Sequence, residues 1–346
     1  MAKERIVTAA AQERERETDV DLQTVEIRPR RLAEYVGQRD LVERLGIALE
    51  AARLRGDPME HVLLHGPPGL GKTTIAHVIA AEMGTHAHVT SGPALTKAGD
   101  LVGTLTKMEA NDVLFIDEIH RLPTAVEEYI YPAMEDFRID FTVDSGMHSR
   151  VVTIGLRPFT LIGATTRAGL LTQALRTRFG ITHNLGFYPE DDVVAILSRA
   201  ARLLRMEAVP AATLRAVASR SRGTPRVALR LLRRVRDFSA VRADGRLDGR
   251  AVDDALALEG VDALGLDELD RRYLRTLAAT YGGGPAGLEA IAASLGEDAL
   301  TLEDVVEPYL LQVGFLARTR QGRRLTDAAF RHLGMEPPAR GGELYG

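Results

Sequence analysis

A glycine-rich loop carries the first residues whose types and spacing could do chemistry. The segment GPPGLGKTT at 66–74 has the form G-x-x-x-x-G-K-T, follows an apolar run at 62–65 and precedes apolar residues at helical spacing. In such a loop, glycines let backbone N–H groups turn toward a phosphate, and the following helix adds the positive end of its dipole. Lys72 would neutralise the β- and γ-phosphates of a nucleotide, and Thr73 would ligate Mg²⁺. The competing interpretation is a glycine-rich turn that only joins a strand to a helix.

Two acidic residues follow a second apolar run. The residues VLFI at 113–116 are expected to form a strand covered on both faces in a parallel sheet, and Asp117 and Glu118 come directly after them. Open α/β sheets bind ligands at the carboxyl ends of their strands. Asp117 could therefore hold Mg²⁺, directly or through water, while Glu118 polarises the water that attacks the γ-phosphate.

Hydroxyl and guanidinium groups follow a third apolar run. The segment FTLIGA at 159–164 predicts another buried strand, which leads to Thr165 and Thr166. Either hydroxyl could position the attacking water, although a helix cap or a turn would use the same residue type. Further along, Arg176 and Arg178 belong to LRTRFG. An arginine there could stabilise γ-phosphate charge across a subunit boundary, or it could be an ordinary solvated charge.

The composition limits the class of protein. The chain has 346 residues, 45% hydrophobic and 27% charged, which excludes a disordered or fibrous protein and allows two or three domains. No apolar run is long enough for a membrane span and no signal peptide is evident, so we expect a cytoplasmic protein without a membrane partner. The lack of cysteine excludes disulfides and thiolate metal sites. Because the net charge is −4, nucleic acid could bind only to a local basic patch.

The elements that must position these residues divide the chain into three parts. Residues 1–188 predict a large α/β domain with a parallel sheet, and about the first 20 of these residues are expected to be disordered. From Pro189 the strands give way to helical spacing, which predicts a small all-α lid at 189–259. Three helical segments and two short strands around a Gly322 turn then predict a winged helix at 262–346.

The charges of this winged helix are unevenly placed. The helix that would enter a major groove carries Glu303, Asp304 and Glu307, whose charge would repel phosphates and argues against base reading. Four arginines instead lie on or beside the hairpin: Arg318, Arg320, Arg323 and Arg324. They form either a solvated face or a contact surface for backbone phosphates.

A second hairpin is predicted inside the large domain. Apolar residues alternate through 138–156 on both sides of Asp144-Ser145-Gly146, a pattern typical of two paired strands joined by a turn. This hairpin could simply add an edge to the sheet, or it could present apolar side chains that a partner covers.

Taken together, these strings resemble the AAA+ ATPases. GPPGLGKTT, DVLFIDEIHR, LIGATTRAGL and LRTRFG are similar to motifs of that class, and YPAMEDF, RGTPR and LLRRVRD resemble its RuvB family of Holliday junction branch-migration motors. The resemblance extends from IRP at 27–29 to GFL at 314–316. It implies a P-loop AAA+ core with a parallel sheet, a small all-α lid and a C-terminal winged helix.

The resemblance also implies roles for residues at matching positions. The residues implied to bind nucleotide are Ile27, Arg28, Tyr35, Val36, Gly69, Leu70, Gly71, Lys72, Thr73, Thr74, Glu135, Asp136, Phe137, Arg178, Tyr188 and Arg226. Thr166 would be sensor 1, Arg178 the finger that acts in trans and Arg226 sensor 2. The expected N-cap Thr224 and first helical residue Pro225 would place Arg226 in a first helical turn. Arg318 and Arg323 are implied to contact DNA.

The function implied by the resemblance is ATP hydrolysis by a homohexameric ring on duplex DNA, which drives Holliday junction branch migration in recombination and repair. The implied partners are RuvA, through the 138–156 hairpin, and the resolving nuclease RuvC. A protein-remodelling ATPase would instead need an exposed aromatic and hydrophobic pair in a pore loop, and none follows the strand at 113–116. A clamp loader or non-hydrolysing switch would not need both Glu118 and Arg178.

Overall fold

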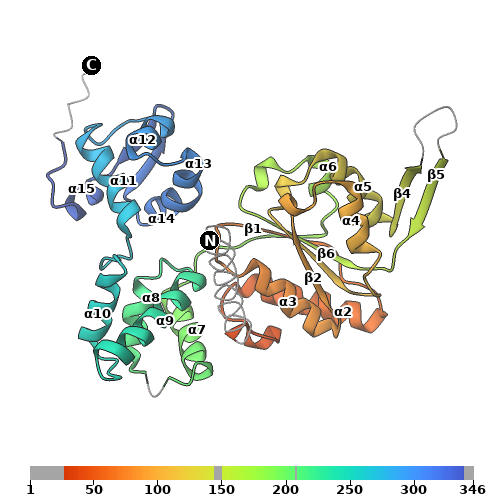
Figure 1. Cartoon of the computed structure of the whole chain (residues 1–346), viewed down its shortest axis with the longest axis horizontal. Helices are drawn as coiled ribbons and strands as arrows, with labels where there is room; N and C mark the ends of the chain where they lie inside the picture. The colour runs from red at the N-terminus through yellow and green to blue at the C-terminus, as the bar shows by residue number, and fades with distance from the viewer. Residues whose placement is uncertain (1–26, 144–149, 207–208, 339–346) are drawn as a thin grey trace, which may run out of the picture. The chain divides into compact units, whose positions relative to one another are not determined.

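The computed structural model describes residues 27–143, 150–206 and 209–338 (Figure 1). The chain divides into two compact units, Met1–Val209 and Pro210–Gly346. The disorder predicted for the first residues and the turn predicted at Asp144-Ser145-Gly146 both lie outside the described residues.

A five-stranded parallel sheet, in the order β2-β3-β6-β1-β7, is the centre of the first unit. Its strands are β1 (Val62–His65), β2 (Ala87–Ser91), β3 (Val113–Asp117), β6 (Thr160–Thr165) and β7 (Ile181–Asn184). The three strands predicted from apolar runs occupy the middle of the sheet, which confirms the predicted parallel α/β core. The edge strands β2 and β7 were not predicted, because their residues are only partly buried and no apolar run marks them.

Helices cover both faces of this sheet (Figure 1). The helices of the first unit before the lid segment are α2 (Arg39–Arg55), α3 (Lys72–Met83), α4 (Ala98–Leu105), α5 (Thr124–Glu135) and α6 (Gln173–Arg176). Short 3₁₀ turns are η1 (Leu32–Glu34), η2 (Gly92–Ala94), η3 (Ile119–Arg121) and η4 (Ala168–Leu170). On one face Leu63, Leu114 and Leu161 of the strands pack with Leu101 of α4 and Ile130 of α5. The helix α3 covers the other face through contacts with β2, β3 and β6.

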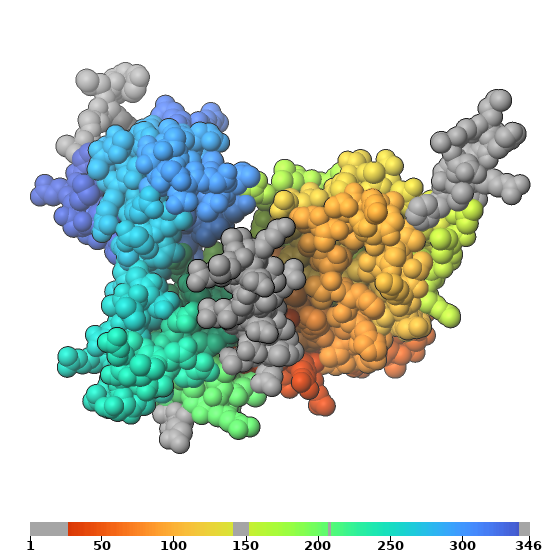
Figure 2. Space-filling model, in the orientation of Figure 1, coloured from red at the N-terminus to blue at the C-terminus, as the bar shows by residue number. Residues whose placement is uncertain are grey.

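The predicted hairpin of the large domain is present as a separate two-stranded sheet. Strands β4 (Arg138–Val143) and β5 (Arg150–Gly155) pair antiparallel, with Arg138 opposite Gly155 and Val143 opposite Arg150. Figures 1 and 2 show that this hairpin projects from the surface of the first unit. Ile139 is buried at its base, whereas Val152 is 45% exposed.

The segment that follows the sheet is helical, as predicted. Its helices are α7 (Glu190–Leu203), α8 (Ala211–Ser219), α9 (Pro225–Arg242) and α10 (Gly249–Leu258). The first of them belongs to the first unit, and the other three pack together in the second. Within the described ranges, no helix combines the length and apolar character that a membrane span requires.

The remainder of the second unit is a winged helix, as predicted. Its elements are α11 (Glu268–Ala279), α12 (Leu288–Leu295), α13 (Ala299–Thr301), the π-helical turn η5 (Leu302–Val306), α14 (Glu307–Gln312), β8 (Leu316–Thr319), β9 (Gly322–Leu325) and α15 (Asp327–His332). The hairpin turn falls at residues 320–321, and Gly322 is the first residue of β9 rather than the turn itself. A side chain there would meet the carbonyl oxygen of Ala286 at 2.4 Å, so glycine is required.

Candidate nucleotide site and DNA interface

The phosphate loop joins β1 to α3, as predicted. Gly69 and Gly71 have φ values of +81° and +99°, in the left-handed region that favours glycine. Lys72 is only 8% exposed, and its Nζ donates to the carbonyl oxygens of Gly66 at 2.8 Å and Pro67 at 2.9 Å. The loop carbonyls hold this buried ammonium group in place. When a nucleotide is bound, phosphate oxygens can replace the carbonyls as its partners.

The start of α3 provides the rest of the phosphate site. Leu70 is fully buried beneath the loop, and Thr73 and Thr74 lie in the first turn of the helix. That turn carries no acidic residue, so the positive end of the helix dipole is not neutralised. The loop, the lysine and the dipole together make an anion site at the carboxyl end of β1.

The acidic pair lies at the end of β3. Oδ1 of Asp117 accepts the backbone N–H of Glu118 at 3.0 Å, and Glu118 has a φ of +49°. Oε2 of Glu118 lies 3.4 Å from Nε2 of His120, whose Nδ1 lies 2.8 Å from the hydroxyl of Thr165. His120 was not predicted to belong to the site. Its only signal was its position two residues after Glu118.

The neighbouring strand brings the threonines to the same edge of the sheet. Because β3 and β6 are adjacent and parallel, with Ile116 opposite Gly163, their carboxyl ends lie side by side. Thr165 is fully buried and its hydroxyl accepts the N–H of Arg167 at 2.9 Å. Thr165 therefore contacts the acidic pair through His120, while Thr166 follows as the first residue beyond the strand.

Two tyrosines lie against the phosphate loop. The hydroxyls of Tyr35 and Tyr188 are 2.9 Å apart, and Tyr188 donates to the carbonyl oxygen of Leu70 at 3.2 Å. A Cβ added to Gly71 would lie 2.8 Å from the Tyr35 hydroxyl, so the loop and the phenol are in close contact. Burial raises the pKa of both tyrosines, which keeps the two phenols protonated.

The segment before these tyrosines is also held in place. Ile27 is buried, and its carbonyl oxygen accepts Nη1 of Arg199 at 2.6 Å. Burial and the nearby charge of Arg28 lower the pKa of His77 on α3, so Arg28 lies near the helix that follows the phosphate loop. Val36 follows Tyr35 directly and is partly buried. Of the residues implied to bind nucleotide, the structure thus places Tyr35 and Tyr188 against the phosphate loop and Arg28 near α3.

Glu135, Asp136 and Phe137, which the resemblance implies to bind nucleotide, lie at the end of α5 and directly after it. Oε1 of Glu135 lies 3.1 Å from Nε of Arg178, so the two side chains form an ion pair. Asp136 pairs with Arg138 at 3.2 Å. Phe137 packs edge-on against Phe159, at 5.9 Å between ring centroids.

Arg226 lies in the second unit, as the second residue of α9. Thr224 is the N-cap and Pro225 the first helical residue, as predicted from the sequence. The Thr224 hydroxyl does not cap the helix, however, and donates to the carbonyl oxygen of Arg222 at 3.3 Å. Arg226 is exposed, and its contact with a nucleotide stays a prediction.

The two wing arginines implied to contact DNA share one buried carboxylate. Arg318 and Arg323 are paired across β8 and β9, and both guanidinium groups bind Glu307 at 2.5 Å and 2.9 Å. Glu307 is fully buried and also accepts the hydroxyl of Tyr273 at 2.8 Å. The sequence places Glu307 on the helix that would enter a DNA groove, but its side chain turns inward to the wing arginines. Sequence spacing does not show this, since Glu307 and the arginines lie on different elements.

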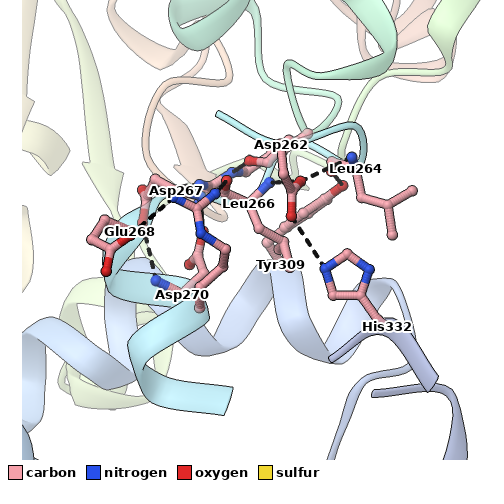
Figure 3. A network of polar contacts seen from close by, with 11 residues as sticks. Asp262, Leu264, Leu266, Asp267, Glu268, Asp270, Tyr309 and His332 are labelled. Atoms are coloured by element: carbon pink, nitrogen blue, oxygen red, sulfur yellow. Dashed lines mark hydrogen bonds and ion pairs between the residues drawn. The ribbon is translucent and has the colours of Figure 1, made fainter. Parts of the chain in front are cut away.

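A polar cluster joins the helical part of the second unit to its winged helix (Figure 3). Arg222 lies 2.9 Å from Asp267 and 2.5 Å from Asp270, and its guanidinium lies 5.2 Å from the ring centroid of Tyr309. Figure 3 also shows Asp262, which accepts the N–H groups of Leu264 and Leu266 and lies 3.1 Å from His332. No motif in the sequence marks this cluster.

Comparisons with known proteins cover almost the whole described chain. The family described as "Holliday junction DNA helicase RuvB P-loop domain" matches residues 27–185. The family "RuvB AAA lid domain" matches 188–262, and "RuvB C-terminal winged helix domain" matches 263–334.

Relatives and solved structures agree with these matches. The chain is 55% identical to the Holliday junction branch migration complex subunit RuvB of Desulfosudis oleivorans over 324 residues, which cover 94% of each chain. It is 54% identical to the subunit of that name from Kosmotoga olearia over 309 residues, covering 89% of this chain and 90% of the relative. The Thermotoga maritima RuvB Holliday junction branch migration motor superposes with a TM-score of 0.82 at 50% identity, covering 90% of this chain and 100% of that one. The chain therefore belongs to the RuvB family of P-loop AAA+ proteins.

Proposed function

We propose that the chain is an ATP-hydrolysing motor that drives branch migration of Holliday junctions. The observation that carries the proposal is the buried Lys72 inside a phosphate loop, at the sheet edge where β3 ends in Asp117 and Glu118. A cation for the phosphates and a carboxylate for the attacking water are the two groups that ATP hydrolysis needs most. The relatives that are at least 54% identical carry the name of a branch migration subunit.

The site residues divide into groups by the part of the nucleotide that each would contact. Ile27, Arg28, Tyr35, Val36 and Tyr188 would hold the base. Tyr35 and Tyr188 lie against the phosphate loop, and Arg28 lies near His77 of α3. Gly69 to Thr74 would hold the phosphates. Glu118 would orient and deprotonate water, and Thr166, which follows β6, would contact the γ-phosphate.

The donor set at this site fits Mg²⁺. Thr73 offers a hydroxyl and Asp117 a carboxylate, both oxygen ligands of the kind a hard cation prefers. Within the described ranges no group of three acidic or histidine side chains could enclose a metal. A site with few protein ligands suits Mg²⁺, because this ion keeps several of its waters and takes further oxygen ligands from a nucleotide. Bound there, it would neutralise charge on the β- and γ-phosphates.

Hydrolysis would require neighbouring subunits. The side chain of Arg178 is 22% exposed and pairs with Glu135, the last residue of α5. We infer that it serves the nucleotide of an adjacent subunit, with Glu135, Asp136 and Phe137 at the same boundary, and that subunits assemble into a homohexameric ring. Arg226 would contact the γ-phosphate from the lid.

Two surfaces would connect this motor to its substrate and partners. The β4–β5 hairpin projects with Val152 exposed, which fits a surface that a partner covers, and we assign it to RuvA. Arg318 and Arg323 would contact the phosphates of duplex DNA without reading sequence. RuvC would join the same complex at the junction.

Three measurements test this proposal. ATP turnover and strand exchange of a synthetic four-way junction would be measured with and without RuvA, and particles on duplex DNA would be imaged by electron microscopy. We expect DNA-stimulated turnover, six-membered rings and branch migration that depends on RuvA. ATP turnover without any junction movement under these conditions would contradict the proposed motor function.

A further inference from the structure

The side chain of Arg178 is fixed by residues of its own subunit. Its guanidinium carbon lies 4.3 Å from the centroid of the Tyr131 ring, well within the range of a cation–π contact. Nη1 donates to the carbonyl oxygen of Ala174 at 2.6 Å, and Nε lies 3.1 Å from Glu135. The ring of Tyr131 therefore supports one face of the guanidinium, while two of its nitrogens contact neighbouring oxygens.

A buried carboxylate holds Tyr131 in this position. The hydroxyl of Tyr131 donates to Oε1 of Glu127 at 2.5 Å, and Glu127 is only 8% exposed. Burial and this hydrogen bond raise the pKa of Tyr131, so the phenol keeps the proton that it donates. A phenol that donates to a carboxylate gains electron density in its ring, which strengthens the attraction for a cation above the ring.

The same carboxylate fixes the backbone that carries Arg178. The hydroxyl of Thr172 also donates to Oε1 of Glu127. Thr172 is the N-cap of α6, where its Oγ1 accepts the N–H of Leu175 at 3.1 Å. The carbonyl oxygen of Leu175 in turn accepts the N–H of Arg178 at 3.2 Å. Glu127 thus connects the ring under the guanidinium to the turn that presents it.

We propose that Tyr131 is a positioning residue for Arg178, and that Glu127 holds its ring in the required orientation. This inference rests on the proposed role of Arg178 in trans. An arginine has many rotamers, and ordering it on each turnover would cost entropy and misplace the charge. A ring against one face limits this movement but leaves the edge of the guanidinium open, so that a γ-phosphate can replace Glu135.

Mixed rings can test this inference, because a residue that positions Arg178 must act on the neighbouring pocket. A donor subunit carries Lys72→Ala and an intact Arg178, whereas an acceptor subunit carries Arg178→Ala and an intact Lys72. Neither hydrolyses ATP alone, and the full-length mixture should regain turnover through the donor's arginine. Tyr131→Leu is then introduced into the donor or into the acceptor.

We expect Tyr131→Leu in the donor to lower the regained kcat by about 10- to 100-fold, the effect of a misplaced catalytic group, with little change in KM. The same substitution in the acceptor should leave the regained turnover intact, because that subunit no longer has the arginine that the ring supports. Tyr131→Phe in the donor keeps the ring but loses the hydrogen bond to Glu127, so its loss should be smaller than that of Tyr131→Leu. Glu127→Gln in the donor should give an intermediate loss.

Tyr129→Leu in the donor is the matched control, since it removes a tyrosine two residues away on α5 and should not reduce kcat. If the parent mixture regains no turnover, the trans role of Arg178 is wrong and this inference falls with it. If the parent mixture is active and Tyr131→Leu has the same effect in donor and acceptor, this inference alone is overturned.

Discussion

The carboxylate of Glu118 lies beside the imidazole of His120, with 3.4 Å between Oε2 and Nε2. Nδ1 of the same ring lies 2.8 Å from the hydroxyl of Thr165, which is fully buried at the end of β6. Since that hydroxyl can donate to Nδ1, Nε2 can carry a proton and donate to the carboxylate. The proposed catalytic carboxylate is therefore connected to the strand that precedes Thr166, the proposed sensor of the γ-phosphate.

Glu118→Gln should separate nucleotide binding from hydrolysis. The amide has nearly the shape of the carboxylate but cannot accept a proton from water, so we expect kcat to fall by about 10²- to 10⁴-fold. The affinity for ATP should persist, because Lys72 and Asp117 are unchanged. Fluorescent nucleotide titration beside a phosphate-release assay measures both quantities. Wild-type turnover in this variant would place the catalytic carboxylate elsewhere.

Lys72→Ala should abolish ATP turnover, with a loss of at least about 10²-fold from removing one preorganised cation. Lys72→Arg should fail as well, because the ammonium is 8% exposed between two loop carbonyls and a planar guanidinium does not fit there. Lys107→Ala, at an exposed lysine in the same unit, is the matched control and should keep wild-type kinetics. Turnover in Lys72→Ala equal to that of the control would rule out the phosphate-loop assignment.

The sequence predicted the site best where one segment determines the structure. The strands β1, β3 and β6 were predicted because strands buried on both faces must be apolar throughout, and the phosphate loop because its glycines and lysine are contiguous. The sequence did not predict the contacts of three side chains, those of His120, Tyr131 and Glu307. Each depends on a partner from another element, and spacing within one segment cannot show which elements pack together.

Arg318 and Arg323 should bind DNA only while Glu307 keeps their side chains ordered. Arg318→Ala with Arg323→Ala should weaken duplex binding and flatten the log–log salt slope by about 0.9 for each lost phosphate contact. DNA-independent ATPase should be unchanged, since the wing belongs to the second unit and the phosphate loop to the first.

The exposed pair Arg320→Ala with Arg324→Ala is the comparison that makes this test specific, because it removes the same charge from the same hairpin. Fluorescence anisotropy at several salt concentrations gives the slopes, and thermal melting checks that each double variant is folded. If the exposed pair changes the slope and the Glu307-bound pair does not, the DNA contacts lie on Arg320 and Arg324.

The polar cluster shown in Figure 3 should make the stability of the fold depend on pH through Asp270. Asp270 is 1% exposed, and burial raises its pKa from 3.8 to about 7, even though Arg222 lies 2.5 Å away. Between these values the folded chain binds more protons than the unfolded chain, so the contribution of this group to the free energy of unfolding falls as pH rises and is constant above about pH 7.

Asp270→Asn removes this titration and leaves Arg222 paired with Asp267 at 2.9 Å. We therefore expect the melting temperature of Asp270→Asn, relative to wild type, to increase from about pH 5 to about pH 7.5. Asp267→Asn is the control. Although burial opposes it, the hydrogen bond from the Asp270 backbone and the charge of Arg222 lower the pKa of Asp267, so its contribution is lost only on acidification below about pH 4, and its difference from wild type should be nearly constant from about pH 5 to about pH 7.5. Differential scanning fluorimetry across this range measures both variants, and a constant difference between Asp270→Asn and wild type would show that Asp270 is ionised throughout.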